Sequence, residues 1–280
     1  MRTFVSAVAV LIGLVMAAVA VPAMWADRNI VQEDGFVALT APLGKDPAFQ
    51  QRLAAAAVNS FSSDQIPGPV VEIVRPILED AAQSLSGLPG YSEAWTETLR
   101  KSHRLSFSDP NTLPAEMNGV SSLALDVAPL VGLVAKRLAE VTSLPLESPE
   151  QVLIPVGQPS QRQLVERVTA YAPMGSAVAV GSAIAFVLAL VAARRRWTVL
   201  AGAGAGALVL AAVWKLAADA VGGAVDGSSS GNAMADIFKH EFVAASTAGF
   251  GQWILAAMVA GAVLLLAGIV LRAVGGRRRS

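Results

Sequence analysis

The sequence lacks cysteine altogether and has only two histidines, His103 and His240, among its 280 residues. Without cysteine, the chain forms no disulfide, carries no thiol nucleophile and offers no thiolate to a metal. No second histidine stands near His240 to complete a zinc pair, and His103 shares a predicted helix face with apolar side chains, which indicates a structural role. The sequence therefore predicts a chain that is not an enzyme, with no catalytic, cofactor-binding or metal-binding residue.

Charge is also scarce, at 15% of residues against 54% hydrophobic residues. Four stretches of about 18–22 residues contain no charge, which matches a hydrocarbon core roughly 30 Å thick at 1.5 Å per helical residue. They comprise residues 4–24, 172–193, 197–214 and 250–271. No acidic, basic or histidine side chain lies deep within them, which argues against an ion or proton pathway. The sequence predicts four transmembrane helices.

Acidic residues are missing from the segments at one set of ends of the four uncharged stretches. The pieces Arg2, 194–196, Arg272 and 277–279 contain eight arginines and no acid, so all 21 acidic residues lie elsewhere. Because cytoplasmic flanks carry the excess of lysine and arginine, we expect a multi-pass plasma-membrane protein with both termini cytoplasmic and residues 25–171 outside. With 17 acids against 11 basic residues, this outer part also lacks the basic surface typical of nucleic-acid binding.

This topology divides the chain into six segments. The largest, residues 25–171, can bury a core of its own and is expected to fold by itself. The first segment is either an uncleaved anchor or a signal peptide, because residues 18–20 (Ala-Val-Ala) offer a small-residue cleavage site. The segments are a transmembrane anchor or signal peptide at 1–24, an extracytoplasmic helical domain at 25–171, a transmembrane hairpin with an arginine-rich cytoplasmic turn at 172–217, an extracytoplasmic loop at 218–249, a fourth transmembrane helix at 250–272 and a cytoplasmic basic tail at 273–280.

The fold class that follows is a mainly α membrane protein whose outer domain is helical, with at most a small two-stranded sheet. Trp95, Leu99 and His103 stand at helical spacing and predict a helix, capped by Ser92, that turns this stripe toward the core. The other expected elements are an extended stretch at 25–44, a helix with Asp46 as N-cap, a helix at 69–85, a loop at 107–119, paired strands at 123–127 and 152–156, a helix at 129–141 between them, a helix at 160–171, and a short helix at 234–246 in the outer loop.

Small residues recur in the predicted spans. Residues 201–207 read AGAGAGA, and glycines at 202, 204 and 206 let helices approach each other closely. Such a face serves either packing within one chain or homo-oligomerisation, and both interpretations stay open.

Several segments together resemble a family of actinobacterial four-span membrane proteins that mostly have no assigned function. The resemblance lies in residues 37–51 (VALTAPLGKDPAFQQ) with 53–57, in 123–138 (LALDVAPLVGLVAKRL), and in a helix leading into the arginines at 194–196. It also includes the YxxAWxxxxxxxH pattern of Tyr91, Ala94, Trp95 and His103. The resemblance implies an envelope protein with an exported helical domain, and it brings no catalytic residue. The sequence departs from the family at SHRLSF around His103 and in its Gly/Ser-rich outer loop.

We therefore expect a non-enzymatic protein of the plasma membrane. Its outer domain would bind a partner protein or an envelope component, or would scaffold a membrane complex. The alternative is a transporter accessory or lipid-handling protein of the cell envelope. The expected partners are the lipid bilayer and a membrane or envelope protein, without nucleic acid or cofactor.

Reporter fusions test the predicted topology. Fusions at Ser106 and Ser229 should report an exported position, and fusions at Arg196 and Ser280 a cytoplasmic one, because the arginine flanks stay inside. A cytoplasmic signal at Ser106 would overturn the orientation.

Overall fold

The computed structural model describes residues 2–53, 87–107, 123–142, 149–156, 159–227, 229 and 231–277. The chain forms two compact units. Unit 1 consists of Met1–Arg28, Val168–Gly223 and Ser246–Ser280, and unit 2 consists of Asn29–Arg167 and Ala224–Ala245.

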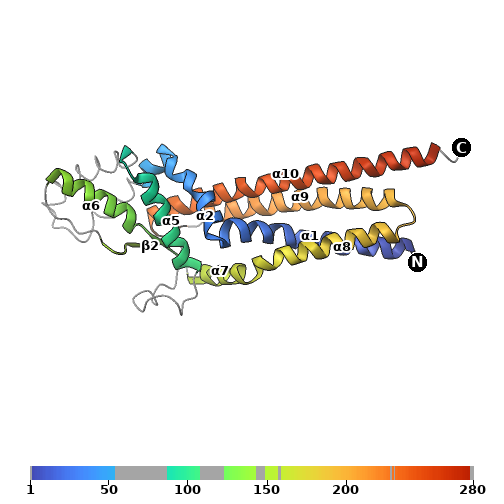
Figure 1. Ribbon diagram of the computed structural model, residues 1–280, viewed down its shortest axis with the longest axis horizontal. Helices are drawn as coiled ribbons and strands as arrows, with labels where there is room; N and C mark the ends of the chain where they lie inside the picture. Colours follow the sequence, from blue (N-terminus) through green and yellow to red (C-terminus); the bar gives the residue numbers. More distant parts are fainter. Residues whose placement is uncertain are drawn as a thin grey trace. The chain divides into compact units, whose positions relative to one another are not determined.

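Unit 1 is built from four helices that are long and apolar enough to cross a membrane, as predicted. They are α1 (Arg2–Ala26), α8 (Gly175–Ala192), α9 (Arg196–Asp226) and α10 (Ala233–Arg277), of which the first 13 residues belong to unit 2. Within unit 1 they run side by side (Figure 1). Much of their apolar surface is exposed, as expected for helices that face lipid rather than water.

Glycines set the closest helix contacts of unit 1. A Cβ atom on Gly204 of α9 would lie 2.6 Å from the Gly261 carbonyl oxygen of α10, so a larger side chain would push these helices apart. At Gly206 a Cβ would meet the side chain of Leu14 of α1, whereas a Cβ on Gly202 would meet nothing within 4 Å. Two of the three glycines thus serve packing within the chain, and Gly202 faces open space.

Three polar side chains join the helices of unit 1 by hydrogen bonds to main-chain carbonyls. The Ser6 hydroxyl donates to Ala189 at 3.0 Å, and the Ser182 hydroxyl donates to Gly13 at 2.8 Å. The Trp214 indole N–H donates to Ala18 at 3.1 Å. These bonds connect α1 to α8 and to α9, and they leave none of the three donors unsatisfied in an apolar surrounding.

Unit 2 begins with helical turns, and the extended stretch predicted for 25–44 is wrong. The end of α1 continues into a π-helix (Asp27–Val31), helix α2 (Glu33–Thr40) and a 3₁₀-helix (Ala41–Lys45). Phe36 and Thr40 are buried one turn apart, and the Thr40 hydroxyl donates to the Phe36 carbonyl at 2.7 Å. This single i, i+4 pair, too short a pattern to stand out in the sequence, sets the helical face.

The small sheet is confirmed. Strands β1 (Ala124–Asp126) and β2 (Leu153–Pro155) pair antiparallel, with Leu125 opposite Ile154 and helix α6 (Ala128–Thr142) between them in the chain. The buried Asp126 carboxylate accepts the main-chain N–H groups of Ala128 at 3.0 Å and Val152 at 3.1 Å. One side chain therefore fixes the start of α6 and the approach of β2.

Of the predicted N-caps Asp46 and Ser92, the structure confirms the first. Asp46 is an N-cap, since its carboxylate accepts the N–H of Ala48 at 2.8 Å. Ser92 is not, because helix α5 (Tyr91–Phe107) already begins one residue earlier. Helix α7 (Pro159–Tyr171) occupies the range expected for it. The predicted helix at 69–85 and nearly all of the loop at 107–119 lie outside the described residues.

The core of unit 2 draws on distant parts of the chain. It includes Met234, Ala235 and Phe238 from the first turns of α10, a segment assigned above to the loop at 218–249. Arg52 and Glu241 form an ion pair at 2.6 Å in the same unit. The other buried members of this core are Phe36, Leu43, Phe49, Leu53, Tyr91, Trp95, Leu99, Leu125, Val127, Leu130 and Ile154.

A fragment of residues 28–170 should therefore be less stable than one that also carries residues 231–245 on a flexible linker. We expect the added segment to raise the free energy of unfolding by about 3–5 kcal/mol, the usual contribution of one buried aromatic side chain. Thermal unfolding followed by far-UV circular dichroism measures this difference. Phe238→Ala in the added segment is the matched control and should remove the gain; equal stability of all three fragments would contradict the assignment of this segment to the core.

Candidate functional site

The stripe predicted on the helix of Trp95 faces the core. Trp95, Leu99 and His103 are 1%, 0% and 5% exposed. The Trp95 indole meets the ring of Phe49 edge-on, with 5.5 Å between centroids, and a Cβ atom added at Gly44 would overlap the indole. The stripe is therefore part of the packing of unit 2, as the structural interpretation of these residues expects.

Two of the sequence motifs, residues 37–51 and the YxxAW pattern, pack against each other. Gly44 and Gln50 come from residues 37–51, whereas Trp95 and Tyr91 come from the YxxAW pattern. Gln50 donates to the Gly44 carbonyl and is hydrogen-bonded to Tyr91, while burial raises the pKa of the Tyr91 phenol. These motifs thus build a common core rather than a reactive site.

His103 is the one buried histidine of the described residues. Its Nε2 lies 3.0 Å from the carbonyl oxygen of Ile30, and because a carbonyl can only accept, this nitrogen carries the proton. The ring stacks on Phe107 at 4.4 Å and contacts Phe36 at 5.1 Å. A neutral imidazole between two aromatic rings thus ties α5 to the π-helix.

Charged groups border His103 on one side. The Arg104 guanidinium donates to both oxygens of Glu33, at 2.8 and 3.1 Å, with Arg100 at 3.8 Å. The hydrogen bond from Arg104 lowers the pKa of Glu33. Burial lowers the pKa of His103, although the Ile30 carbonyl and the Glu33 charge oppose this shift. Among the described residues no group of three or more His, Asp or Glu side chains could hold a metal ion.

Residues 227–231 of the Gly/Ser-rich loop spell G-S-S-S-G, which matches the spacing of a serine nucleophile between two glycines. The functional motif places its serine after a strand, whereas here helix α9 comes before it. The Ser229 hydroxyl donates to Asp236 at 2.7 Å in the first turn of α10, and the Gly231 N–H donates to Ser229 at 3.2 Å. Ser229 therefore supports the start of a helix.

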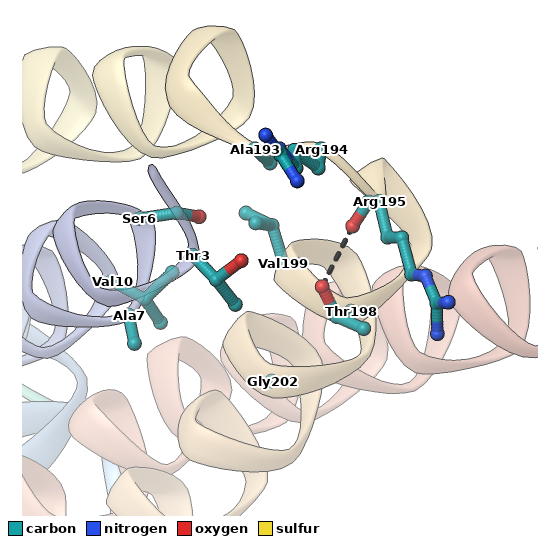
Figure 2. Close-up of a pocket in the computed structure, with 10 residues that line it drawn as sticks. All are labelled: Thr3, Ser6, Ala7, Val10, Ala193, Arg194, Arg195, Thr198, Val199 and Gly202. Atoms are coloured by element: carbon teal, nitrogen blue, oxygen red, sulfur yellow. Dashed lines mark hydrogen bonds between the residues drawn. The ribbon is translucent and has the colours of Figure 1, made fainter. Parts of the chain in front are cut away.

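An arginine-lined cavity of about 580 Å³ lies at one end of unit 1. Figure 2 shows Thr3 and Ser6 of α1 facing Val199 of α9, with the link between α8 and α9 above them. Arg194 and Arg195 line the cavity, and neither has an ion-pair partner among the described residues. In Figure 2 the guanidinium of Arg195 is turned away from the cavity, and its side chain is exposed.

The electrostatics of this cavity favour an anion. Its lining residues include two arginines and no acid: Thr3, Ser6, Ala7, Val10, Ala193, Arg194, Arg195, Thr198, Val199 and Gly202. Helix α9 starts at Arg196, and a helix N-terminus carries a positive partial charge. The main-chain N–H and the hydroxyl of Thr198 both donate to the Arg195 carbonyl, at 3.1 and 2.7 Å, which fixes the turn.

An apolar groove of about 300 Å³ adjoins the cavity, and Val199 lines both. Residues of all four helices form the groove, among them Leu14, Phe186, Leu210 and Leu264. The flanking position of the arginines identifies them in the sequence. Their proximity to Thr3, Ser6 and Gly202 appears only in the structure, because no sequence pattern shows which faces of two helices meet.

No protein family, curated protein or solved structure matches this chain. Two features of the chain itself bear on its function, the folded core of unit 2 and the arginine-lined end of unit 1.

The burial of His103 predicts that the stability of unit 2 depends on pH. The folded chain binds the His103 proton less tightly than the unfolded chain does, so stability is complete above the ordinary pKa of about 6.5 and falls as the pH drops below it. Glu33 has a lowered pKa and loses its contribution only below its ordinary value of 4.5. The window from about pH 6.5 to 5 thus reports on His103.

Thermal unfolding of the full chain in detergent, measured between pH 7.5 and 5, tests this dependence. His103→Gln should flatten the decline below pH 6.5, whereas His240→Gln, which replaces the only other histidine, should retain it. A decline that survives His103→Gln would show that other groups cause it.

Proposed function

We propose that this chain is a non-enzymatic, multi-pass plasma-membrane protein whose arginine-bearing ends are cytoplasmic and whose unit 2 lies outside. There unit 2 binds a partner protein or an envelope component, or scaffolds a membrane complex. The observation that carries the proposal is the gathering of separate arginine-bearing pieces at one end of unit 1.

The orientation is supported by contacts at that end. Thr3, next to Arg2, lines the same cavity as Arg194 and Arg195. The guanidinium of Arg272 on α10 lies 5.0 Å from the ring centroid of Trp197 on α9. Pieces far apart in the sequence thus concentrate positive charge at one end, and such a concentration is retained on the cytoplasmic side of a membrane.

A binding or scaffolding role is supported by the way unit 2 uses its polar groups. The buried Asp126 carboxylate and the His103 ring hold elements together, and Ser102 accepts the Asp126 N–H at 2.9 Å while it donates to Thr98 at 2.6 Å. These hydrogen bonds hold the helices and strands of unit 2 in fixed positions, so its surface keeps one conformation. A surface that is already ordered loses little conformational entropy when a partner binds.

The alternative, a transporter accessory or lipid-handling protein, is favoured by one specific observation. The arginine-lined cavity and the apolar groove meet at Val199 and together resemble a site for an amphipathic molecule. This role is compatible with partner binding by unit 2, since it concerns different residues.

Single cysteines test the main proposal, because the natural chain has none. Ser92→Cys on the exposed surface of α5 should react with a membrane-impermeant maleimide in intact cells, whereas the exposed Thr198→Cys should react only after permeabilisation. Thr198→Cys leaves every arginine in place, so the charges on which the orientation depends are unchanged. Labelling of Thr198→Cys in intact cells would contradict the orientation.

The same two cysteines, each carrying a photo-crosslinker, test partner binding in native membranes. We expect Ser92→Cys to give a discrete protein adduct that mass spectrometry identifies and that Thr198→Cys does not form. If neither Ser92→Cys nor a second unit 2 position, the exposed Leu164 of α7, yields a specific protein adduct, partner binding by unit 2 is wrong.

A further inference from the structure

We infer that unit 1 binds one anionic phospholipid at its arginine-bearing end. The phosphate of the headgroup would occupy the arginine-lined cavity, and an acyl chain would lie in the adjoining groove. The inference requires only that the four helices cross a membrane, and it goes beyond the role proposed for unit 2.

The polar half of the site matches a phosphate. Arg194 and Arg195 line the cavity with no acidic side chain beside them, and neither guanidinium is held in an ion pair by a described residue. Both side chains are exposed and can turn toward a ligand. Arginine donates in a planar fork that fits phosphate oxygens, and the start of α9 adds a positive partial charge.

The apolar half matches a hydrocarbon chain. The groove is lined by aliphatic and aromatic side chains, and the single indole N–H among them, that of Trp214, already donates to Ala18. Along α9 the lining residues extend from Val199 to Trp214, which at 1.5 Å per residue is about 22 Å. That length exceeds half of a hydrocarbon core roughly 30 Å thick, so the groove accommodates a chain from one leaflet.

The junction of the two halves selects the class of ligand. Val199 lines both, so the charged end of a ligand and its apolar end would meet at this residue. A free phosphate would leave the groove empty, and a neutral lipid would leave two arginines without a counter-charge. An anionic phospholipid satisfies both halves at once, and the arginine-bearing flank is where headgroups lie in a membrane.

Two glycines of α9 provide a matched pair of variants. A Cβ atom at Gly202 would meet nothing within 4 Å, and Gly202 lines the cavity, so Gly202→Phe should fill the headgroup site without displacing a helix. A Cβ atom at Gly222 would also meet nothing within 4 Å, but Gly222 is not part of the lining. Gly222→Phe is therefore the control for a bulky side chain on the same helix.

The arginines provide a second matched pair. Arg194→Gln together with Arg195→Gln should weaken retention of the lipid about thirty-fold, which corresponds to about 2 kcal/mol for two basic residues near an anionic headgroup. Arg196→Gln removes a charge from the same turn outside the lining and should have a much smaller effect. Maleimide labelling of Ser92→Cys in each background verifies that the orientation is unchanged.

The measurement is the phospholipid that remains on the full-length protein after reconstitution and detergent washing. Vesicles of phosphatidylcholine with and without phosphatidylglycerol supply the lipid, and mass spectrometry of the intact complex counts it. We expect about one phosphatidylglycerol per chain, lost in Gly202→Phe and in the double arginine variant but kept in Gly222→Phe and Arg196→Gln.

Three outcomes would overturn the inference. Retention in Gly202→Phe would show that the lipid lies elsewhere, and equal retention of phosphatidylcholine would show that the arginines do not select charge. Inorganic phosphate or glycerol phosphate that protects the lipid-free protein against heat as well as phosphatidylglycerol does would show that the groove contributes nothing.

Discussion

The lack of charge along four membrane-length helices is the constraint on which unit 1 depends. A stretch that is apolar enough to enter hydrocarbon must pair its main-chain polar groups within the chain, and a helix does so. The few polar side chains obey the same rule, and the hydroxyls of Ser6 and Ser182 donate to carbonyls of the neighbouring helix. Such bonds need closely packed backbones, and at Gly175 of α8 a Cβ atom would lie 2.8 Å from the main-chain nitrogen of Met24 of α1. Glycine content, helix packing and hydrogen bonding are thus consequences of one requirement.

Local patterns in the sequence predicted the parts of the fold that depend on interactions between residues close in the sequence. Uncharged length identified the four helices, and alternation of apolar residues around Leu125 and Ile154 identified the two strands. Asp46 before a proline identified a helix start. Local patterns did not predict that residues 25–44 are helical. The buried face of this segment is defined by a single pair, Phe36 and Thr40, and by tertiary contacts of α2 with α5.

The features that local patterns did not predict depend on contacts between residues far apart in the sequence. The sequence predicts a short helix around Phe238 within the outer loop, and only its contact with the core of unit 2 shows that Phe238 is buried there. In the candidate site, charge counting identified Arg194 and Arg195, whereas the cavity beside them depends on Gly202 pointing into open space. No residue pattern reveals which side of a glycine-rich helix remains uncovered, since neighbouring glycines at 204 and 206 are covered by other helices.

The contribution of α10 to unit 2 also has a consequence for biosynthesis. The ion pair of Arg52 with Glu241 and the burial of Phe238 join residues nearly 190 positions apart. While a ribosome adds roughly 5–20 residues per second, the core therefore stays open from the emergence of β2 until that of α10, an interval of about 4–17 s. Phe36 of α2, whose ring lies 5.6 Å from that of Phe242 of α10, lacks this contact during that time, although the helices α8 and α9 have already been made. The last of the four membrane-length helices is thus also the element whose synthesis completes the core of unit 2.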